Sequence, residues 1–204
     1  VPHIARTVFP EDAILVADGG NTAVFSAFFW QVQKAGSSLG TPHMGHLGAG
    51  VGRALGAAVA FPDRAVCCII GDGAFGMHPQ EIETAVRHGL KVVFIVIADG
   101  QWGMVKMSQS VARHPVKMMI RKQLDPSETT GVDLGPMSYD VLARSMGAHG
   151  ERVSEASDLA DAMLRSLSSG TTSVIHVDVD PTQNLWAPGL LHFRKMHAEP
   201  EGEA

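Results

Sequence analysis

Two long runs of apolar residues dominate the middle of the chain, and each is followed at once by an acidic turn. Residues 65–70 and 92–97 contain no polar position, which is typical of strands buried on both faces of a parallel sheet. The residues between the runs have the spacing of an amphipathic helix, which we expect to begin at Pro79. The pattern therefore predicts a strand–helix–strand unit whose two strands end at the same edge of a sheet.

Strands and helices are predicted to alternate along the rest of the chain. Further strands are expected at residues 13–17, 149–153 and 172–179. Further helices are expected at about 21–34, 49–60, 139–146 and 155–167. Asn21 or Thr22 is expected to cap the first of these helices. The alternation predicts one α/β domain with about five strands.

Two stretches do not fit the strand–helix alternation. Residues 104–136 have no clear strand period and are long for a connection, so we expect a lid over an anionic substrate or a contact between subunits. The basic residues of this stretch are Lys106, Arg113, Lys117, Arg121 and Lys122. The domain is expected to span residues 1–181 and to be followed by a tail, 182–204, that folds back across the domain or a neighbouring subunit.

Composition narrows the class of protein. The 204 residues are 45 % hydrophobic and carry a net charge of −5, which argues against a nucleic-acid partner because such a protein would present a basic face. No apolar run approaches the ~20 residues needed to span a membrane, and the first residues do not resemble a signal peptide. Cys67 and Cys68 are adjacent in a predicted strand, so we expect buried thiols rather than a disulfide, in a cytoplasmic protein.

The acidic turns supply the main candidate chemistry. Asp72 and Asp99 each follow a predicted strand and are one crossover connection apart, so they are expected at the same sheet edge, where ligands of α/β proteins bind. Two carboxylates can hold Mg²⁺ together with a substrate phosphate. The glycines beside Asp72 allow a close approach of the backbone, and the amides of Ala74 and Phe75 can donate to phosphate oxygens. The alternative is that Gly71–Gly73 is only a tight turn.

Further candidate residues are expected near the same sheet edge. Asp18-Gly19-Gly20-Asn21 lies between a predicted strand and a helix, which is a position suited to anions or simply to a loop and a cap. The glycines at 48, 50 and 52 do not complete a dinucleotide-binding fingerprint, because Arg53 stands where the third glycine belongs. His43, His46 and His78 are candidate proton carriers, although most histidines of a chain are structural.

The chain resembles the thiamine-diphosphate enzymes of the acetolactate synthase and pyruvate decarboxylase superfamily. The resemblance rests on GDG at 71–73, the helix and strand that follow, Asp99, and the motif GQWGMV at 100–105. Members usually have two asparagines where this chain has Ala98 and Asp99, so an oxygen ligand is kept and a negative charge is added. The implied fold is a three-layer α/β domain with a mainly parallel six-stranded sheet and helices on both faces.

The resemblance implies a thiamine diphosphate site and a Mg²⁺ site. The implied cofactor contacts are Gly20, Asn21, Thr22, Pro42, His43, Met44, Gly71, Asp72, Gly73, Ala74, Phe75, Asp99, Gln101, Trp102, Gly103 and Met104. Within this set the carbonyl of Pro42 accepts from the aminopyrimidine, and Met44 supports the bent cofactor unless it is core filler. The implied Mg²⁺ ligands are Asp72, Asp99 and the carbonyl of Gln101.

The implied activity is decarboxylation of a 2-oxo acid, with or without carboligation, on a cofactor that acts as the electron sink. The family also needs a glutamate on a separate pyrimidine-binding domain, and no residue here matches it. We therefore expect a fragment of a longer chain or the smaller subunit of a two-chain decarboxylase, in a homo- or hetero-oligomer. Two alternative functions remain. One is a nucleotide-binding protein, although this chain lacks the phosphate-binding motif GxxxxGK[ST]. The other is a non-catalytic assembly domain.

Overall fold

The computed structural model describes residues 1–40, 44–114, 116–117, 120 and 128–181. Its centre is a six-stranded sheet with the order β2-β1-β3-β4-β6-β5, in which every neighbouring pair is parallel. The strands are β1 (Ile14–Asp18), β2 (Ser38–Leu39), β3 (Val66–Gly71), β4 (Val92–Ala98), β5 (His149–Val153) and β6 (Ser173–Asp178). The predicted three-layer α/β fold is confirmed, and the sheet is parallel throughout these strands.

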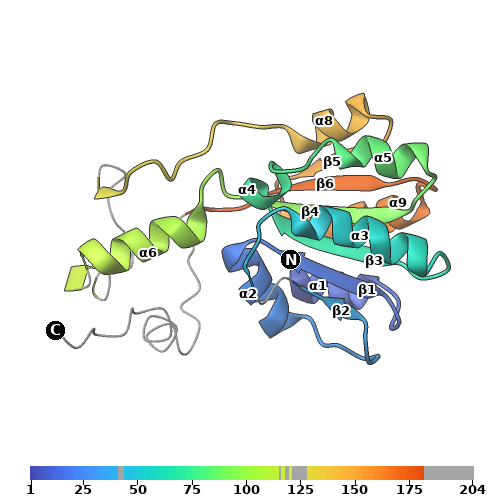
Figure 1. The fold of residues 1–204 in the computed structure, drawn as a ribbon, viewed down its shortest axis with the longest axis horizontal. Coiled ribbons are helices and arrows are strands. Elements are labelled where there is room, and N and C mark those ends of the chain that lie inside the picture. The colour runs from blue at the N-terminus through green and yellow to red at the C-terminus, as the bar shows by residue number, and fades with distance from the viewer. Residues whose placement is uncertain (41–43, 115, 118–119, 121–127, 182–204) are drawn as a thin grey trace.

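Helices cover both faces of the sheet (Figure 1). They are α1 (Pro2–Val8), α2 (Gly20–Phe29), α3 (Ala49–Ala60), α4 (Asp72–Phe75), α5 (Glu81–Arg87), α6 (Gly103–Arg113), α8 (Tyr139–Ser145) and α9 (Leu159–Ser168), with a short 3-10 helix at Ala156–Asp158. The side chains of α3, α5 and α8 share one core with the sheet, and those of α1 and α9 share the other. In Figure 1, α6 stands away from the sheet on the side of α4.

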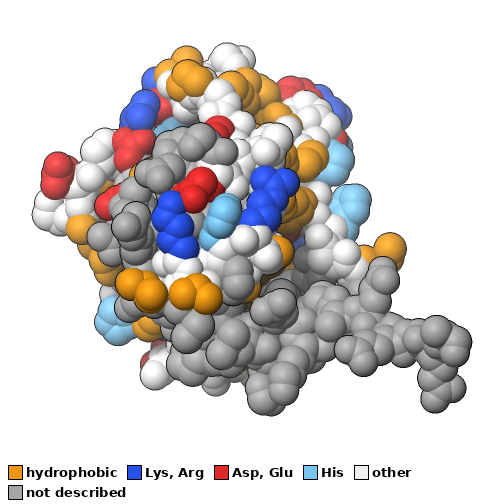
Figure 2. Space-filling view, turned by 90° about the vertical axis from the view of Figure 1, so that its left-hand side faces the viewer, with side chains coloured by type: hydrophobic (Ala, Val, Ile, Leu, Met, Phe, Trp, Pro, Cys, Tyr) orange, Lys and Arg blue, Asp and Glu red, His pale blue; other side chains and the backbone are white. Residues whose placement is uncertain are grey.

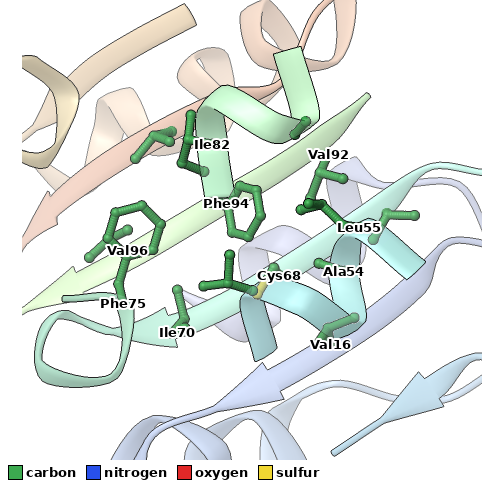
Figure 3. Close-up of a cluster of buried hydrophobic side chains, with 14 of the residues drawn as sticks. Val16, Ala54, Leu55, Cys68, Ile70, Phe75, Ile82, Val92, Phe94 and Val96 are labelled. Atoms are coloured by element: carbon green, nitrogen blue, oxygen red, sulfur yellow. The ribbon is translucent and has the colours of Figure 1, made fainter. Parts of the chain in front are cut away.

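Strands β3 and β4 are apolar at consecutive positions because both of their faces are covered. Cys68, Ile70, Phe94 and Val96 point into one core, which Figure 3 shows packed against Phe75. Cys67, Ile69 and Ile95 belong to the core on the opposite face. Both cysteines are buried and free, which confirms the prediction made from their adjacent positions.

Several predicted boundaries are wrong by a few residues, each for a physical reason. Helix α2 ends at Phe29 rather than near Lys34, because Trp30 turns into the core and packs beside Phe9, with ring centroids 6.3 Å apart. The N-cap of α2 is Gly19 rather than Asn21 or Thr22, and its φ of +91° suits glycine.

The remaining differences concern helix starts and short elements. Helix α5 begins at Glu81, because Pro79 lies in a tight turn in which Ile82 N donates to its carbonyl. Helix α6 occupies a stretch that we expected to be an irregular connection, and α1 and β2 were not predicted. Among the described residues, the structure contains no helix with the length and apolar character needed to cross a membrane.

Candidate functional site

Three turns converge at the carboxyl edge of the sheet, after β1, β3 and β4. They border a cavity of about 1320 Å³. Most of the predicted cofactor contacts line it: Gly20, Asn21, Thr22, Gly71, Asp72, Gly73, Ala74, Asp99, Gln101, Trp102, Gly103 and Met104. Residues that are more than eighty positions apart in the sequence therefore share one site.

The turns approach one another so closely that side chains are excluded at their glycines. A Cβ atom on Gly20 would lie 2.6 Å from Cβ of Met104, and one on Gly73 would lie 2.6 Å from the ring of Trp102. A Cβ atom on Gly103 would meet Asp99 Oδ2 at 2.9 Å and Asn21 Nδ2 at 3.0 Å. The glycine positions thus bring Asn21 and Asp99 together beside the turn of Asp72.

The carboxylate of Asp72 joins two of the three turns. Its Oδ1 accepts from the amide of Gly73 at 2.8 Å, and its Oδ2 accepts from the amide of Gly100 at 2.8 Å. The side chain is buried, and burial together with the nearby charge of Asp99 raises the pKa of Asp72 to about 6. An unneutralised charge at this position therefore carries a cost that a bound cation would remove.

Asp99 lies beside Asp72 and is held by the residue that follows its turn. The amide of Gln101 donates to Asp99 Oδ1 at 3.2 Å, and Gln101 Nε2 donates to Asp99 Oδ2 at 3.3 Å. Burial raises the pKa of Asp99, and the bonds from Gln101 oppose that rise. The prediction that both carboxylates lie at one sheet edge is confirmed, because β3 and β4 pair in register up to Gly71 and Ile97.

These residues fit a hard divalent cation. Each oxygen of Asp72 accepts one amide hydrogen bond and keeps a second lone pair for a metal. The carbonyl of Gln101, just before α6, takes no part in the main-chain hydrogen bonds of the bridge between Gln101 and Asp133. Those two bonds use Trp102 N and Gly100 O instead. Within the described ranges no three His, Cys, Asp or Glu side chains form a metal cluster, so a cation here would need that carbonyl and ligand oxygens as well.

Two of the predicted contacts, Phe75 and Met44, do not line the cavity, and two more fall outside the described residues. The side chain of Phe75 is buried in the core, with its ring 5.9 Å from Phe94, so only its backbone can face the site. Met44 is 90 % exposed, which excludes the alternative that it is core filler in this chain. Pro42 and His43 lie outside the described residues.

Two of the three histidine candidates, His46 and His78, do not line the cavity. His46 is exposed and stacks on His78, with ring centroids 6.3 Å apart and planes 14° apart, and neither ring is among the lining of the cavity. The catalytic role expected for His43 and His46 therefore remains a prediction.

Three residues that support the site were not among the predicted site residues. Asp18 is buried and accepts from the amides of Gly19 at 2.6 Å and Gly50 at 2.7 Å, so it fixes the first turn to the start of α3. Its position at the end of a strand is the same signal that identified Asp72. Asp133 and Tyr139 contact the site from distant segments, and no local pattern could have indicated them.

The long stretch after the third turn leaves the sheet and returns to it. Gln109 and Thr130 exchange two hydrogen bonds, and Lys106 pairs with Asp133 at 3.1 Å. Figure 2 shows basic, acidic and histidine side chains together on this side of the molecule, with hydrophobic side chains beside them. The basic residues of α6 that we expected to face a substrate are in part engaged by the chain's own returning segment.

Comparison with known proteins places the chain in a family. The model of the thiamine pyrophosphate enzyme C-terminal TPP-binding domain matches residues 18–177. The acetolactate synthase large subunit IlvG of Mycobacterium tuberculosis is 33 % identical over 171 residues, which are 84 % of this chain and 29 % of that protein. The 2-hydroxyacyl-CoA lyase 1 of Dictyostelium discoideum is 30 % identical over 193 residues, covering 91 % of this chain and 31 % of that protein.

A solved structure agrees with these matches. The thiamine diphosphate-dependent 4-hydroxybenzoylformate decarboxylase of Rhodococcus jostii RHA1 superposes with a TM-score of 0.73 at 26 % identity. The alignment covers 88 % of this chain and 32 % of that one. The chain therefore spans less than a third of the length of these relatives.

Proposed function

The chain belongs to the thiamine pyrophosphate enzymes, as their C-terminal TPP-binding domain, and from this premise we propose that it anchors the cofactor's diphosphate through Mg²⁺ in an enzyme acting on 2-oxo acids. The observation that carries the proposal is the meeting of Asp72, Asp99 and Gln101 at one cavity. Asp72 is already oriented by the amides of Gly73 and Gly100. Little reorganisation is then needed when a cation arrives.

We propose specific roles for the residues around the diphosphate. Asp72, Asp99 and the carbonyl of Gln101 would hold Mg²⁺, and the cation would offset the negative charge of the cofactor's diphosphate. The amides of Ala74 and Phe75 precede the first main-chain hydrogen bond within α4 and can donate to phosphate oxygens. Asn21 and Thr22 face the same space from α2, since they stand beside Gly103 and Gly71 respectively.

When bound, thiamine diphosphate supplies an electron sink for cleaving a bond next to a carbonyl group. The chain's own contribution is placement and the exclusion of water. Apolar residues of α2 and the chain that follows it, including Phe25, Phe29 and Trp30, line the cavity beyond the carboxylates. We propose that this wall shelters the reacting end of a small substrate, as expected for acetolactate synthase-like decarboxylation and carboligation.

We further propose that activity needs a pyrimidine-binding domain, in the same polypeptide or on another subunit. The chain covers 29 % of the M. tuberculosis relative, and no residue here matches the glutamate that the resemblance requires. A two-chain decarboxylase and an assembly domain without activity are the alternatives that experiment must separate.

Calorimetric titration of the chain with thiamine diphosphate and Mg²⁺ tests the anchor. We expect binding that depends on Mg²⁺, is preferred over ATP, and is abolished in Asp72→Ala. Asp63→Ala, which removes an exposed carboxylate on the loop before β3, is the matched control and should bind as the parent does.

The possible titration results distinguish the proposed function from its alternatives. Equal binding of ATP would favour a nucleotide protein, and no binding of either ligand would favour an assembly domain. Unchanged binding in Asp72→Ala would remove the proposed metal anchor.

A further inference from the structure

The backbone of the Asp72 turn is bound by a residue that is distant from it in the sequence. The hydroxyl of Tyr139, at the start of α8, donates to the carbonyl oxygen of Asp72 at 3.2 Å. That oxygen also accepts from the amide of Gly76 at 2.9 Å. The turn therefore has one bond from within itself and one from a separate element.

Tyr139 is fixed in place on both faces of its ring. The ring meets Phe75 edge-on at 5.4 Å between centroids and 88° between planes, and it stacks on His176 at 5.6 Å and 29°. Only 5 % of the residue is exposed. Because burial also raises its pKa to about 12, the hydroxyl stays protonated and remains a donor.

His176 ties Tyr139 to β6 and is itself oriented by charge. The amide of Tyr139 donates to Nδ1 of His176 at 3.3 Å, so that nitrogen carries no proton and Nε2 donates to Asp178 Oδ1 at 3.1 Å. Asp178 in turn accepts two bonds from Arg152, at 2.8 and 2.7 Å, and one from Ser154 at 2.6 Å. A continuous set of bonds thus runs from the edge strand β5 to the turn of Asp72.

We propose that Tyr139 is a positioning residue that holds the Asp72 turn in its metal- and diphosphate-binding conformation, with His176 and Asp178 fixing Tyr139 in turn. The inference rests on the proposed function, because it assumes that Asp72 is a cofactor anchor. Packing alone does not require a hydroxyl here: phenylalanine would fill the same space between Phe75 and His176. The oxygen of Tyr139 is explained by the carbonyl to which it donates.

The variant Tyr139→Phe tests the inference, since it removes one oxygen and keeps the ring. We expect the dissociation constant for Mg²⁺ with thiamine diphosphate, measured by calorimetry, to rise about fivefold, the effect of one hydrogen bond. The matched control is Thr172→Val. Thr172 donates a buried hydroxyl to the carbonyl of Leu90 at 2.8 Å, at the opposite end of the sheet, so its loss should lower stability without weakening binding.

A second measurement needs no variant. Tyr139 is the chain's single tyrosine, so protein labelled with ¹³C at the tyrosine ζ carbon gives one resonance that reports on this hydroxyl. We expect the resonance to shift when Mg²⁺ and thiamine diphosphate are added together.

Four outcomes would overturn the inference. If the parent protein binds the cofactor, equal affinity in Tyr139→Phe or a resonance that does not move overturns the role of Tyr139 alone. If the parent protein binds no thiamine diphosphate, both this inference and the proposed function fail. Equal weakening in Thr172→Val would assign the effect to general loss of stability rather than to positioning.

Discussion

Asp72 is buried and Asp99 is half-buried, and these two carboxylates of like charge stand beside each other at this site. Asp72 carries a pKa of about 6 because of burial and the charge of Asp99. Such a pair is unfavourable in the empty domain and favourable around a divalent cation. We therefore expect the charge of Asp99, where the superfamily usually has asparagine, to lower the stability of the metal-free domain and to raise its affinity for the cation.

Replacing Asp99 by asparagine tests that trade. Asparagine keeps an oxygen for the metal and an acceptor for the amide of Gln101, but it removes the charge beside Asp72. We expect Asp99→Asn to raise the melting temperature of the metal-free chain and to weaken Mg²⁺ binding. Thermal unfolding in chelator and calorimetry with Mg²⁺ measure the two effects, and a loss of stability without metal would contradict the argument.

The raised pKa of Asp72 also predicts how stability depends on pH. In the unfolded chain its carboxyl has an ordinary pKa of about 4, whereas in the folded chain the pKa is about 6. Between these values the folded state binds more protons, so the free energy of unfolding decreases as pH rises through this window. Without metal, the protein should melt at a lower temperature at pH 7 than at pH 5.

Bound cofactor and Mg²⁺ should reverse that trend, because the cation neutralises the same carboxylates. We expect the rise in melting temperature on adding both to be larger at pH 7 than at pH 5. Scanning calorimetry at the two pH values, with and without Mg²⁺, makes the comparison. A metal-free chain that is more stable at pH 7 would show that Asp72 does not dominate this range.

At the scale of elements, the site depends on how closely α2 approaches the first turn of α6. Alanine at Gly20 would place its Cβ 2.6 Å from Cβ of Met104, which can be relieved only by moving one backbone. We expect Gly20→Ala to displace the 101–104 turn and weaken cofactor binding at least tenfold. The affinity measured by calorimetry should show this loss even where the variant remains folded by circular dichroism.

Gly52→Ala is the control for that change. Gly52 lies within α3, and a Cβ there meets nothing within 4 Å. Alanine should stabilise this helix by about 0.5–1 kcal/mol and leave binding unchanged. Similar binding losses in both variants would mean that the close approach of Gly20 to Met104 is unimportant.

The elements that could be predicted from the sequence are those with a strong local pattern. The apolar runs of β3 and β4 identified two central strands because both faces of the sheet are covered. Strand β2 has only two residues, both exposed, so it has no hydrophobic pattern to detect. Asp72 was identifiable from its place after a strand, whereas Tyr139 reaches the same turn across 67 positions and only the fold reveals it.

At the scale of the whole molecule, the cavity is bordered by α2 and the 99–104 turn, and several apolar side chains of α2 remain exposed. Phe28 is 57 % exposed and Phe29 is 42 % exposed, in a helix that also carries Asn21 and Thr22 of the site. Exposed aromatic side chains beside a ligand cavity are typical of a surface that another domain covers. This arrangement supports the proposal that a partner domain completes the enzyme.

The isolated chain should therefore bind cofactor but turn over no 2-oxo acid at a rate typical of the family. Adding a pyrimidine-binding domain that supplies the glutamate should restore decarboxylation. Carbon dioxide release from a set of 2-oxo acids measures both states. Full activity of the chain alone would show that no partner is needed.

The antiparallel bridge between Gln101 and Asp133 has a consequence for how such enzymes diversify. It fastens the departing and returning ends of a long excursion to each other at the very point where Gln101 meets the carboxylates. The connecting segment between Gln101 and Asp133 can therefore be lengthened, shortened or replaced while the two carboxylates keep their positions. We expect changes of length or sequence in this connection to leave the positions of Asp72 and Asp99 unaltered.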